Sequence, residues 1–352
     1  MFHSFSLPIL LSIFLAAALV VWIAGVQLSN TTDVLSSRLK LGEALGGVIL
    51  LAIATNLPEI AITTSAALSH NVGIAIGNIL GGIGIQTVVL VLLDIFGLWS
   101  EDALSFAAAS LELVLEGVLV VVVLCLSIMG TQLPKALIFA RVTPGALLIA
   151  IAWVVGVWLL SKARKDLPWQ EKGRAPGAMH GHRGDKTKET AQKWGTARVV
   201  AVFLIAAAVT LIAGVVLEES GNEIATHIGL SGVLFGSTVL AAATSLPELS
   251  TGLASVKAGA YNLAFSDIFG GNAFLPVLFL LATLLSGEAV LPQAKNTDIY
   301  LAGLGVLLTT VYLYGLIFRP KKQILHMGID SLVVLILYLI GVAGLFAIAR
   351  GS

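Results

Sequence analysis

Long apolar stretches separated by short polar breaks run through most of this chain. A helix needs about 20 mostly apolar residues to cross the hydrocarbon layer of a bilayer. Ten stretches of the sequence meet that requirement, and the breaks between them hold polar or turn-forming residues. We therefore expect ten membrane-spanning helices. Their ranges are 7–29, 41–68, 72–97, 106–129, 136–160, 196–217, 230–256, 261–286, 298–318 and 327–349.

The composition supports a membrane protein. Of the 352 residues, 57% are apolar and 11% are charged, and the mean hydropathy is +0.98. A soluble domain carries roughly 25% charged residues, so most of this surface must meet lipid. The chain holds 20 Lys and Arg against 20 Asp and Glu, and this balance indicates no nucleic-acid partner.

A polar connection at residues 161–195 divides the chain into two halves. Basic residues mark the cytoplasmic side of a membrane protein. If this connection is cytoplasmic, that side holds 16 of the 20 lysines and arginines. We therefore expect a multi-pass protein of the cell (inner) membrane with both termini extracytoplasmic. The expected division is a first five-helix repeat at 1–160, a cytoplasmic loop at 161–195 and a second five-helix repeat at 196–352.

Residues 47–86 recur without a gap 189 positions later, at residues 236–275. The copies share Thr-x-Leu-Pro-Glu and a Gly-Gly pair in one register, which chance does not readily produce. They lie five spans apart and therefore cross the membrane in opposite directions. Such inverted repeats place the substrate of a transporter between the copies, near the midplane. The predicted fold is an all-α polytopic membrane protein with ten transmembrane helices as two inverted five-helix repeats.

Each copy places a glutamate inside a span, Glu59 in the first and Glu248 in the second. A charged side chain at such a depth costs about 2.5 kcal/mol or more, so it is a functional candidate by default. Each glutamate follows a proline, which cannot donate a hydrogen bond to the carbonyl of Ala54 or Ala243. A cation held beside the glutamate would satisfy that freed carbonyl.

The oxygens of the two copies match the needs of calcium, which takes about six to eight oxygen ligands. The two glutamates offer carboxylate oxygens, the two alanines offer carbonyls, and Thr55 and Thr244 can complete the shell. Two carboxylates neutralise one divalent ion. The empty pocket would be costly to keep ionised and should take monovalent cations or protons instead. The sequence therefore predicts a cation antiporter.

Two further polar residues, Asn78 and Asp267, occupy matching positions in the glycine-rich segments 77–82 and 266–271. A charged residue within a span favours the ion site or its surroundings. The glycines favour a packing role, because small residues let helices approach closely. The predicted metal-binding set is Glu59, Glu248, Thr55, Thr244, Ala54, Ala243, Asn78 and Asp267.

The repeats resemble those of the cation/calcium exchanger superfamily, especially its sodium/calcium exchanger branch. Each copy in that family reads approximately Gly-Thr-Ser-x-Pro-Glu, followed by Gly-Asn-x-x-Gly-Ser-Asn. This chain has Ala-Thr-Asn-Leu-Pro-Glu at 54–59 and Ala-Thr-Ser-Leu-Pro-Glu at 243–248. The resemblance implies an ion exchanger whose calcium site is formed by the glutamate of each copy and the preceding threonine. By position these residues are Glu59, Glu248, Thr55 and Thr244.

Several departures from the family pattern bear on sodium binding. Gly82 and Gly271 stand where the family has the serine used for sodium binding. Gln86 and Leu275 replace a usual Asn or Asp, and Asn56 replaces a serine. The calcium-like core is kept while several sodium-ligating oxygens are missing. Protons are therefore a serious alternative to sodium as the counter-ion.

Other interpretations stay open from the sequence. The protein could exchange another cation (K⁺, Mn²⁺, or Na⁺ for H⁺), or be a channel-like or non-transporting member of the fold. We expect a transporter and not an enzyme, with no cofactor, and with cations and the bilayer as partners; the oligomeric state is left open. Glu112 and Glu116 are expected to be interfacial carboxylates, and the acidic run 218–223 is expected to be a solvated loop.

Overall fold

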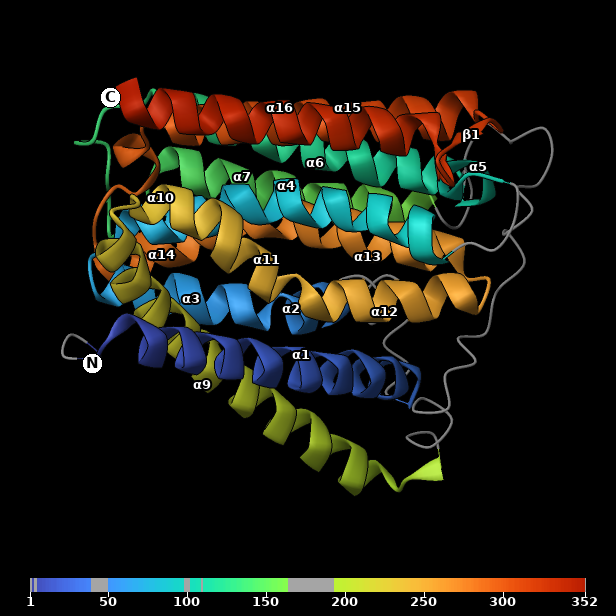
Figure 1. Cartoon of the computed structure of the whole chain (residues 1–352), viewed down its shortest axis with the longest axis horizontal. Helices are drawn as coiled ribbons and strands as arrows, with labels where there is room; N and C mark the ends of the chain where they lie inside the picture. Colours follow the sequence, from blue (N-terminus) through green and yellow to red (C-terminus); the bar gives the residue numbers. More distant parts are fainter. Residues whose placement is uncertain are drawn as a thin grey trace.

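The computed structural model describes residues 2, 5–38, 50–97, 102–108, 110–163 and 193–351. Within these ranges the chain is almost entirely helical, and the long helices lie side by side along one direction (Figure 1). The elements are α1 (Leu7–Arg38), α2 (Leu50–Thr55), α3 (Leu57–Leu68), α4 (Val72–Gly97), α5 (Leu104–Ala108), α6 (Leu111–Thr131), α7 (Pro144–Ala163), α9 (Thr196–Ile228), α10 (Gly232–Phe235), the π-helix η2 (Gly236–Leu240), α11 (Ala241–Thr244), α12 (Leu246–Lys257), α13 (Tyr261–Phe274), the 3₁₀ helix η3 (Leu275–Val277), α14 (Leu278–Ser286), the 3₁₀ helix η4 (Leu291–Gln293), α15 (Asn296–Phe318), β1 (Gln323–Ile324), β2 (Met327–Gly328) and α16 (Ile329–Gly351).

Eight helices of the described residues are long and apolar enough to cross a membrane. A ninth candidate is the bent pair Gly232–Thr244 and Leu246–Lys257, which turns by 42° at its break. The expected span at 41–68 is present as α2 and α3, and residues 41–49 lie outside the described part of the chain. The described residues therefore contain eight or nine candidate spans, and the expected count of ten is not confirmed exactly.

Two spans are longer than their apolar stretches predicted. The first continues from residue 29 to Arg38, and the sixth continues from residue 217 to Ile228. The acidic run at 218–223 therefore lies within α9, and the expectation of a solvated loop there is wrong. Its first member, Glu218, is buried and accepts a hydrogen bond of 2.8 Å from the Ser65 hydroxyl on α3. A tertiary partner keeps this polar stretch helical.

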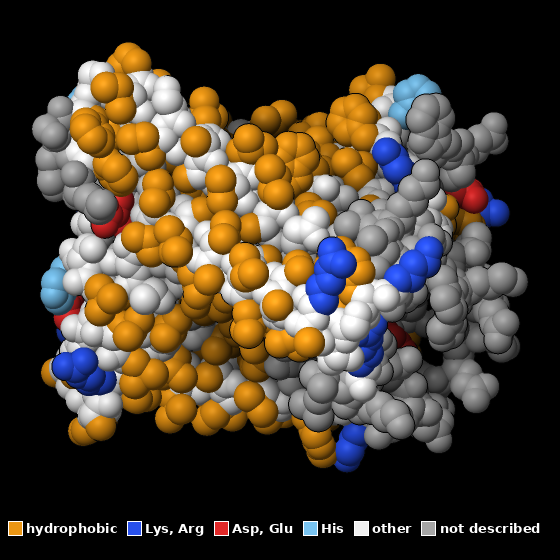
Figure 2. Space-filling view, turned by 90° about the horizontal axis from the view of Figure 1, so that it is seen from below, with side chains coloured by type: hydrophobic (Ala, Val, Ile, Leu, Met, Phe, Trp, Pro, Cys, Tyr) orange, Lys and Arg blue, Asp and Glu red, His pale blue; other side chains and the backbone are white. Residues whose placement is uncertain are grey.

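The surface supports a multi-pass membrane protein. Hydrophobic side chains cover the middle of the face seen in Figure 2, and charged side chains gather towards its two ends. On α1 and α9, large apolar side chains such as Leu15 and Ile212 are each 66% exposed. Such a belt would be unfavourable in water, and it suits contact with lipid.

The core of the molecule is built from α4 and the α13–α14 segment. About 72% of the most apolar stretch of α4 is buried, compared with 17% for α16 at the periphery. Helix α4 approaches α10 and η2 through glycines. A Cβ on Gly77 would lie 3.0 Å from the Val233 Cα, and one on Gly81 would overlap Ser237. The packing role expected for these glycines is confirmed.

The two repeat segments break at equivalent residues. Asn56 separates α2 from α3, and Ser245 separates α11 from α12, with nearly the same backbone angles (φ −91°, ψ 17° and φ −84°, ψ 2°). Pro58 and Pro247 occupy the first turn of the following helix, where the missing N–H and the ring prevent a continuous helix. From these breaks α3 and α12 run in opposite directions, towards opposite ends of the molecule (Figure 1).

Candidate functional site

Two buried glutamates lie at the breaks of the repeat segments. Glu59 is in the first turn of α3 and Glu248 in the first turn of α12, with exposed fractions of 0% and 2%. The charge of Glu59 acts directly on Glu248. None of their four carboxylate oxygens has a hydrogen-bond partner of standard geometry among the described residues. Two interacting buried carboxylates without hydrogen bonds of standard geometry form an acceptor-rich site, which suits a cation.

A threonine of the opposite copy lies beside Glu59. Thr244 is fully buried and faces the Glu59 carboxyl group. Its hydroxyl is 3.1 Å from the Ala241 carbonyl and can donate to it. A hydroxyl that donates to its own helix keeps lone pairs for a cation. Its counterpart Thr55 is also buried, and its hydroxyl lies 3.5 Å from the Asn56 amide nitrogen.

The predicted residue Asp267 contributes a third carboxylate. It lies on α13, and its charge acts on Glu248. The Thr251 hydroxyl, on α12, donates a hydrogen bond of 3.2 Å to it. Within the described ranges, however, no three acidic, His or Cys residues are close enough together to hold one metal ion. Asp267 therefore adds negative potential beside the two glutamates and is not a third member of a tight carboxylate cluster.

The remaining predicted residues are all buried, but they differ in position. Ala54 and Ala243 lie just before the breaks, with 2% and 7% exposure. Asn78 on α4 is fully buried, and neither atom of its side-chain amide has a partner in the described part of the chain. Its backbone nitrogen lies against Gly236 of η2, and none of the described contacts joins it to a glutamate.

The two copies differ around the glycines that replace the family's serines. A Cβ on Gly271 would lie 3.1 Å from the amide nitrogen of Asn56 and 3.3 Å from the side-chain oxygen of Gln86. A Cβ on Gly82 would instead lie 3.3 Å from a methyl group of Leu275. The surroundings of Gly271 are therefore polar, whereas those of Gly82 are apolar. The symmetric motif is embedded in an asymmetric lining.

One buried carboxylate was misjudged from the sequence. Glu116 on α6 is 2% exposed, not interfacial, and the Ser266 hydroxyl donates a hydrogen bond of 2.9 Å to it. Ser266 adjoins Asp267 on α13, which links Glu116 to the polar surroundings of Glu248. The sequence signal was the depth of Glu116 within an apolar stretch. Glu112, one turn earlier, is only partly buried, in keeping with its expected place near the helix end.

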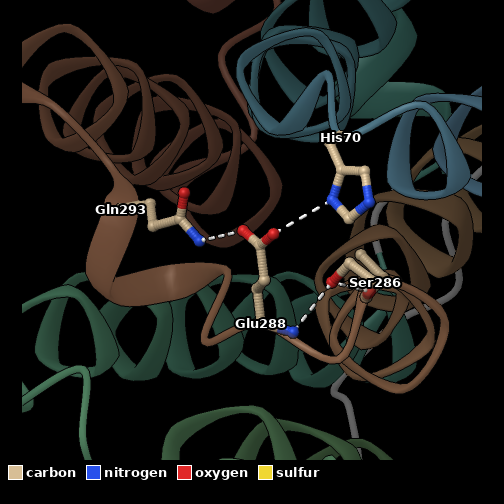
Figure 3. A network of polar contacts seen from close by, with 5 residues as sticks. His70, Ser286, Glu288 and Gln293 are labelled. Carbon is tan, nitrogen blue, oxygen red and sulfur yellow. Dashed lines mark hydrogen bonds and ion pairs between the residues drawn. The ribbon is translucent and has the colours of Figure 1, made fainter.

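The end of the molecule towards which α3 runs carries a pocket of about 350 Å³. Its polar lining includes His70, Asn222, Gln293 and Lys295. His70 lies 3.0 Å from a Glu288 oxygen, and the Gln293 amide donates a 3.0 Å hydrogen bond to the other oxygen (Figure 3). The Gln293 bond and, to a smaller extent, His70 lower the pKa of Glu288. This network joins the α3–α4 turn to the segment after α14.

Comparisons with known proteins identify the fold and the family. The chain is 25% identical over 288 residues to CaxA of Alkalimonas amylolytica, covering 80% of this chain and 82% of that protein. The structure matches the H⁺/Ca²⁺ exchanger CAX with a TM-score of 0.67 and 16% identity, over 97% of this chain and 87% of that one. It also matches the sodium-calcium exchanger NCX_Mj with a TM-score of 0.59 and 17% identity, over 96% and 99% of the two chains.

At these identities the two solved structures show a shared fold. The family assignment rests on the model for the sodium/calcium exchanger protein family, which matches residues 9–163 and 198–347. These ranges include both Thr-x-Leu-Pro-Glu segments and nearly all of the described helices. This chain therefore belongs to the sodium/calcium exchanger protein family.

Proposed function

We propose that this protein is a secondary active antiporter that exchanges Ca²⁺ for H⁺ or Na⁺ by alternating access. The ion is held between the two Thr-x-Leu-Pro-Glu segments. The observation that carries the proposal is the pair Glu59 and Glu248, two buried carboxylates without standard hydrogen-bond donors at opposed helix breaks. A divalent cation would neutralise both charges and supply the partner that their oxygens lack.

The neighbouring groups complete a calcium-type shell. The Thr244 and Thr55 hydroxyls and the carbonyls of Ala54 and Ala243 are hard oxygen ligands, the kind that Ca²⁺ prefers. The first turns of α3 and α12 also point the positive ends of two helix dipoles at the carboxylates. This arrangement lowers the cost of keeping them ionised while the pocket changes its occupant.

The lining favours protons over sodium as the counter-ion. A sodium ion needs several oxygens, and both serine positions of the family pattern are glycine here. Around Gly82 the nearest side chain is that of Leu275, which offers no oxygen. Protons on the glutamates require no shell. Sodium retains one argument in its favour, because Asn56 and Gln86 place side-chain amides around Gly271.

The decisive experiment measures uptake of radiolabelled Ca²⁺ into proteoliposomes that hold the purified protein. One set carries a pH gradient and the other a sodium gradient. We expect uptake driven by the pH gradient, and loss of that uptake in Glu59→Gln and in Glu248→Gln. Glu288→Gln, at an exposed surface position, is the matched control and should transport normally. Uptake without any gradient would instead indicate a channel.

The orientation of the chain is part of the proposal. We propose that the end of the molecule holding α5 and β1 faces the cytoplasm of a cell whose inner membrane contains the protein. Basic residues at that end include Arg38, Lys162, Arg198, Lys257 and Arg319, as positive-inside topology requires (Figure 1). Residues 164–192, the main part of the expected cytoplasmic loop, lie outside the described residues. Membrane-impermeant labelling of cysteines placed at positions 5 and 322 would test this orientation.

A further inference from the structure

A second pair of buried carboxylates lies far from the repeat breaks. Asp94 is near the end of α4 and Asp330 is in the first turn of α16, with exposed fractions of 1% and 5%. The charge of Asp94 acts on Asp330, and a Cβ on Gly328 would lie close to an oxygen of each carboxylate. On α4, Gln86 lies beside Gly271 and Asn56, close to the first break, and Asp94 follows Gln86 by eight residues. At about 1.5 Å per residue, roughly 12 Å of helix separates these two positions. The pair is therefore distinct from the site between Glu59 and Glu248.

Asp94 is held in place as a carboxylate by the backbone. One oxygen accepts a 2.8 Å hydrogen bond from the Leu104 nitrogen on α5, and the other accepts a 2.7 Å bond from the Gly328 nitrogen on β2. Each carboxylate oxygen has two lone pairs, so both retain one acceptor position. The segments 102–108 and 323–328, which cap this end of the molecule, are thus fixed around an anion.

Asp330 is held more weakly: the Ser105 hydroxyl and the backbone N–H groups of Asp330 and Ser331 face its carboxylate, but none of them forms a hydrogen bond of standard geometry. Neither of its oxygens has a hydrogen-bond partner of standard geometry in the described ranges, and the same holds for the buried hydroxyl of Ser105 beside it. The backbone closes around the carboxylate on both sides. A Cβ on Gly315 would overlap one oxygen, and a Cβ on Gly328 would crowd the other. An anion enclosed in this way is costly unless a cation accompanies it.

The described cations nearby contact Phe106, although the buried Nε of Arg319 has no hydrogen-bond partner of standard geometry among the described residues. Arg319 donates a hydrogen bond to the Phe106 carbonyl and lies 4.7 Å from the centre of the Phe106 ring. Lys321 lies 5.2 Å from the same ring. Among the charges that act on Asp330, the structure identifies Asp94 and no basic side chain. The available oxygens are carboxylate and hydroxyl groups, which bind hard divalent cations rather than soft metals.

We propose that Asp94 and Asp330, with the Ser105 hydroxyl, bind a divalent cation of the Ca²⁺ class at this end of the molecule. The site is separate from the transport site and does not depend on the proposed function. The Ser331 hydroxyl, which lies 3.2 Å from the Tyr312 hydroxyl, borders the pair and can supply a further oxygen. The bound ion would join α4, α5, the β1–β2 hairpin and α16, and would stabilise the folded chain in proportion to its occupancy.

The test uses the full-length protein in detergent with Glu59→Gln and Glu248→Gln, which disable the proposed transport site. Terbium(III) is the probe, because it replaces Ca²⁺ and is sensitised by a nearby tyrosine such as Tyr312. We expect one Tb³⁺ per chain, displaced by Ca²⁺, and at least tenfold weaker binding after Asp330→Asn. Asp298→Asn is the matched control and should leave binding unchanged. Asp298 is equally buried in the first turn of α15, but at the opposite end of the molecule.

Three results would overturn the proposal. The first is a folded protein with both Glu59→Gln and Glu248→Gln that binds no Tb³⁺, which would mean that Asp94 and Asp330 share a proton. The second is binding that survives Asp330→Asn in a protein with a normal melting temperature. The third comes from a second variant, used if Asp330→Asn does not fold. Tyr312→Phe is expected to keep Ca²⁺-displaceable binding of Tb³⁺ but to lose most of the sensitised emission. Undiminished emission would place the ion elsewhere.

Discussion

The Ser266 hydroxyl on α13 donates a 2.9 Å hydrogen bond to the buried carboxylate of Glu116 on α6. The bond joins two helices across the interior, next to the aspartate whose charge acts on Glu248. Glu116 therefore contacts the helix that carries Asp267. Two helices that only packed through apolar side chains would have no use for a carboxylate at this depth.

Replacing Glu116 with glutamine should weaken Ca²⁺ binding without abolishing transport. The removal of one nearby negative charge, at an effective dielectric constant of about 20, costs a cation on the order of 1 kcal/mol. We therefore expect about a fivefold higher Ca²⁺ concentration for half-maximal uptake. Glu112→Gln, on the same helix but partly exposed, should change this concentration less than twofold. Equal effects of the two variants would contradict the assignment.

Substitutions of the three carboxylates near the repeat breaks should reduce Ca²⁺ uptake to different extents. Glu59→Gln or Glu248→Gln leaves one carboxylate to balance a divalent ion, so each should reduce Ca²⁺ uptake at least 100-fold. Asp267→Asn keeps both glutamates and the hydrogen bond acceptor for Thr251, and should reduce apparent affinity about tenfold with maximal uptake largely kept. Binding of Ca²⁺ to the purified variants, measured by calorimetry, checks this order independently of transport.

The apolar surroundings of Gly82 should restrict sodium coupling. The double variant Gly82→Ser with Leu275→Asn restores two oxygens of the family pattern, and we expect it to gain Ca²⁺ uptake driven by a sodium gradient. Gln86→Leu makes the opposite change near Gly271 and should leave proton-driven uptake in place. Paired measurements in sodium and pH gradients distinguish these effects. A double variant that stays insensitive to sodium would show that these positions do not select the counter-ion.

Helix contact through Gly81 should be sensitive to a single methyl group. The Cβ of Gly81→Ala would overlap Ser237, so we expect a loss of about 1–3 kcal/mol and a melting temperature lower by several degrees. Gly270→Ala is the matched control, since a Cβ there meets no atom within 4 Å. It should be neutral or slightly stabilising. Thermal unfolding in one detergent compares the two variants directly.

The Glu288 network should make stability depend on pH in the acidic range. Its hydrogen bonds with Gln293 and His70 hold the pKa of Glu288 below its usual 4.5. A carboxyl group whose pKa is lower in the folded state stabilises the fold above its unfolded pKa, and this contribution is lost as the pH falls through the folded value. Glu288→Gln should therefore lower the melting temperature slightly at pH 7. The difference from the unchanged protein should shrink as the pH falls below 4.5 and through the lower pKa of the folded state.

Much of the fold could be predicted from the sequence, because local chemistry determines it. The length of the apolar stretches indicated the spans, and Pro58 and Pro247 indicated freed carbonyls within two of them, although both spans were expected to be continuous. The repeated motif indicated that Glu59 and Glu248 matter, and the structure places both in the interior. These features depend on residues close together in the chain.

The features that the sequence did not reveal depend on contacts between distant segments. Glu116 accepts a hydrogen bond from Ser266 on α13, and in the part of α9 beyond residue 217 Glu218 accepts one from Ser65 on α3. Asp94 accepts a hydrogen bond from the backbone nitrogen of Gly328 on β2, which lies 234 positions later in the chain. No local pattern specifies such partners, since a buried carboxylate and an interfacial one have similar sequence neighbours.

The unequal linings of Gly82 and Gly271 have a consequence for the direction of transport. If the two repeats exchange conformations during the cycle, a fully symmetric pair would give outward-open and inward-open forms of equal free energy. Here a movement of the second repeat shifts Leu275 relative to the ion, whereas a movement of the first repeat shifts Asn56 and Gln86. The two forms therefore differ in free energy before any gradient is applied. The empty carrier would rest mainly on one side of the membrane, and its apparent affinities on the two faces would differ accordingly.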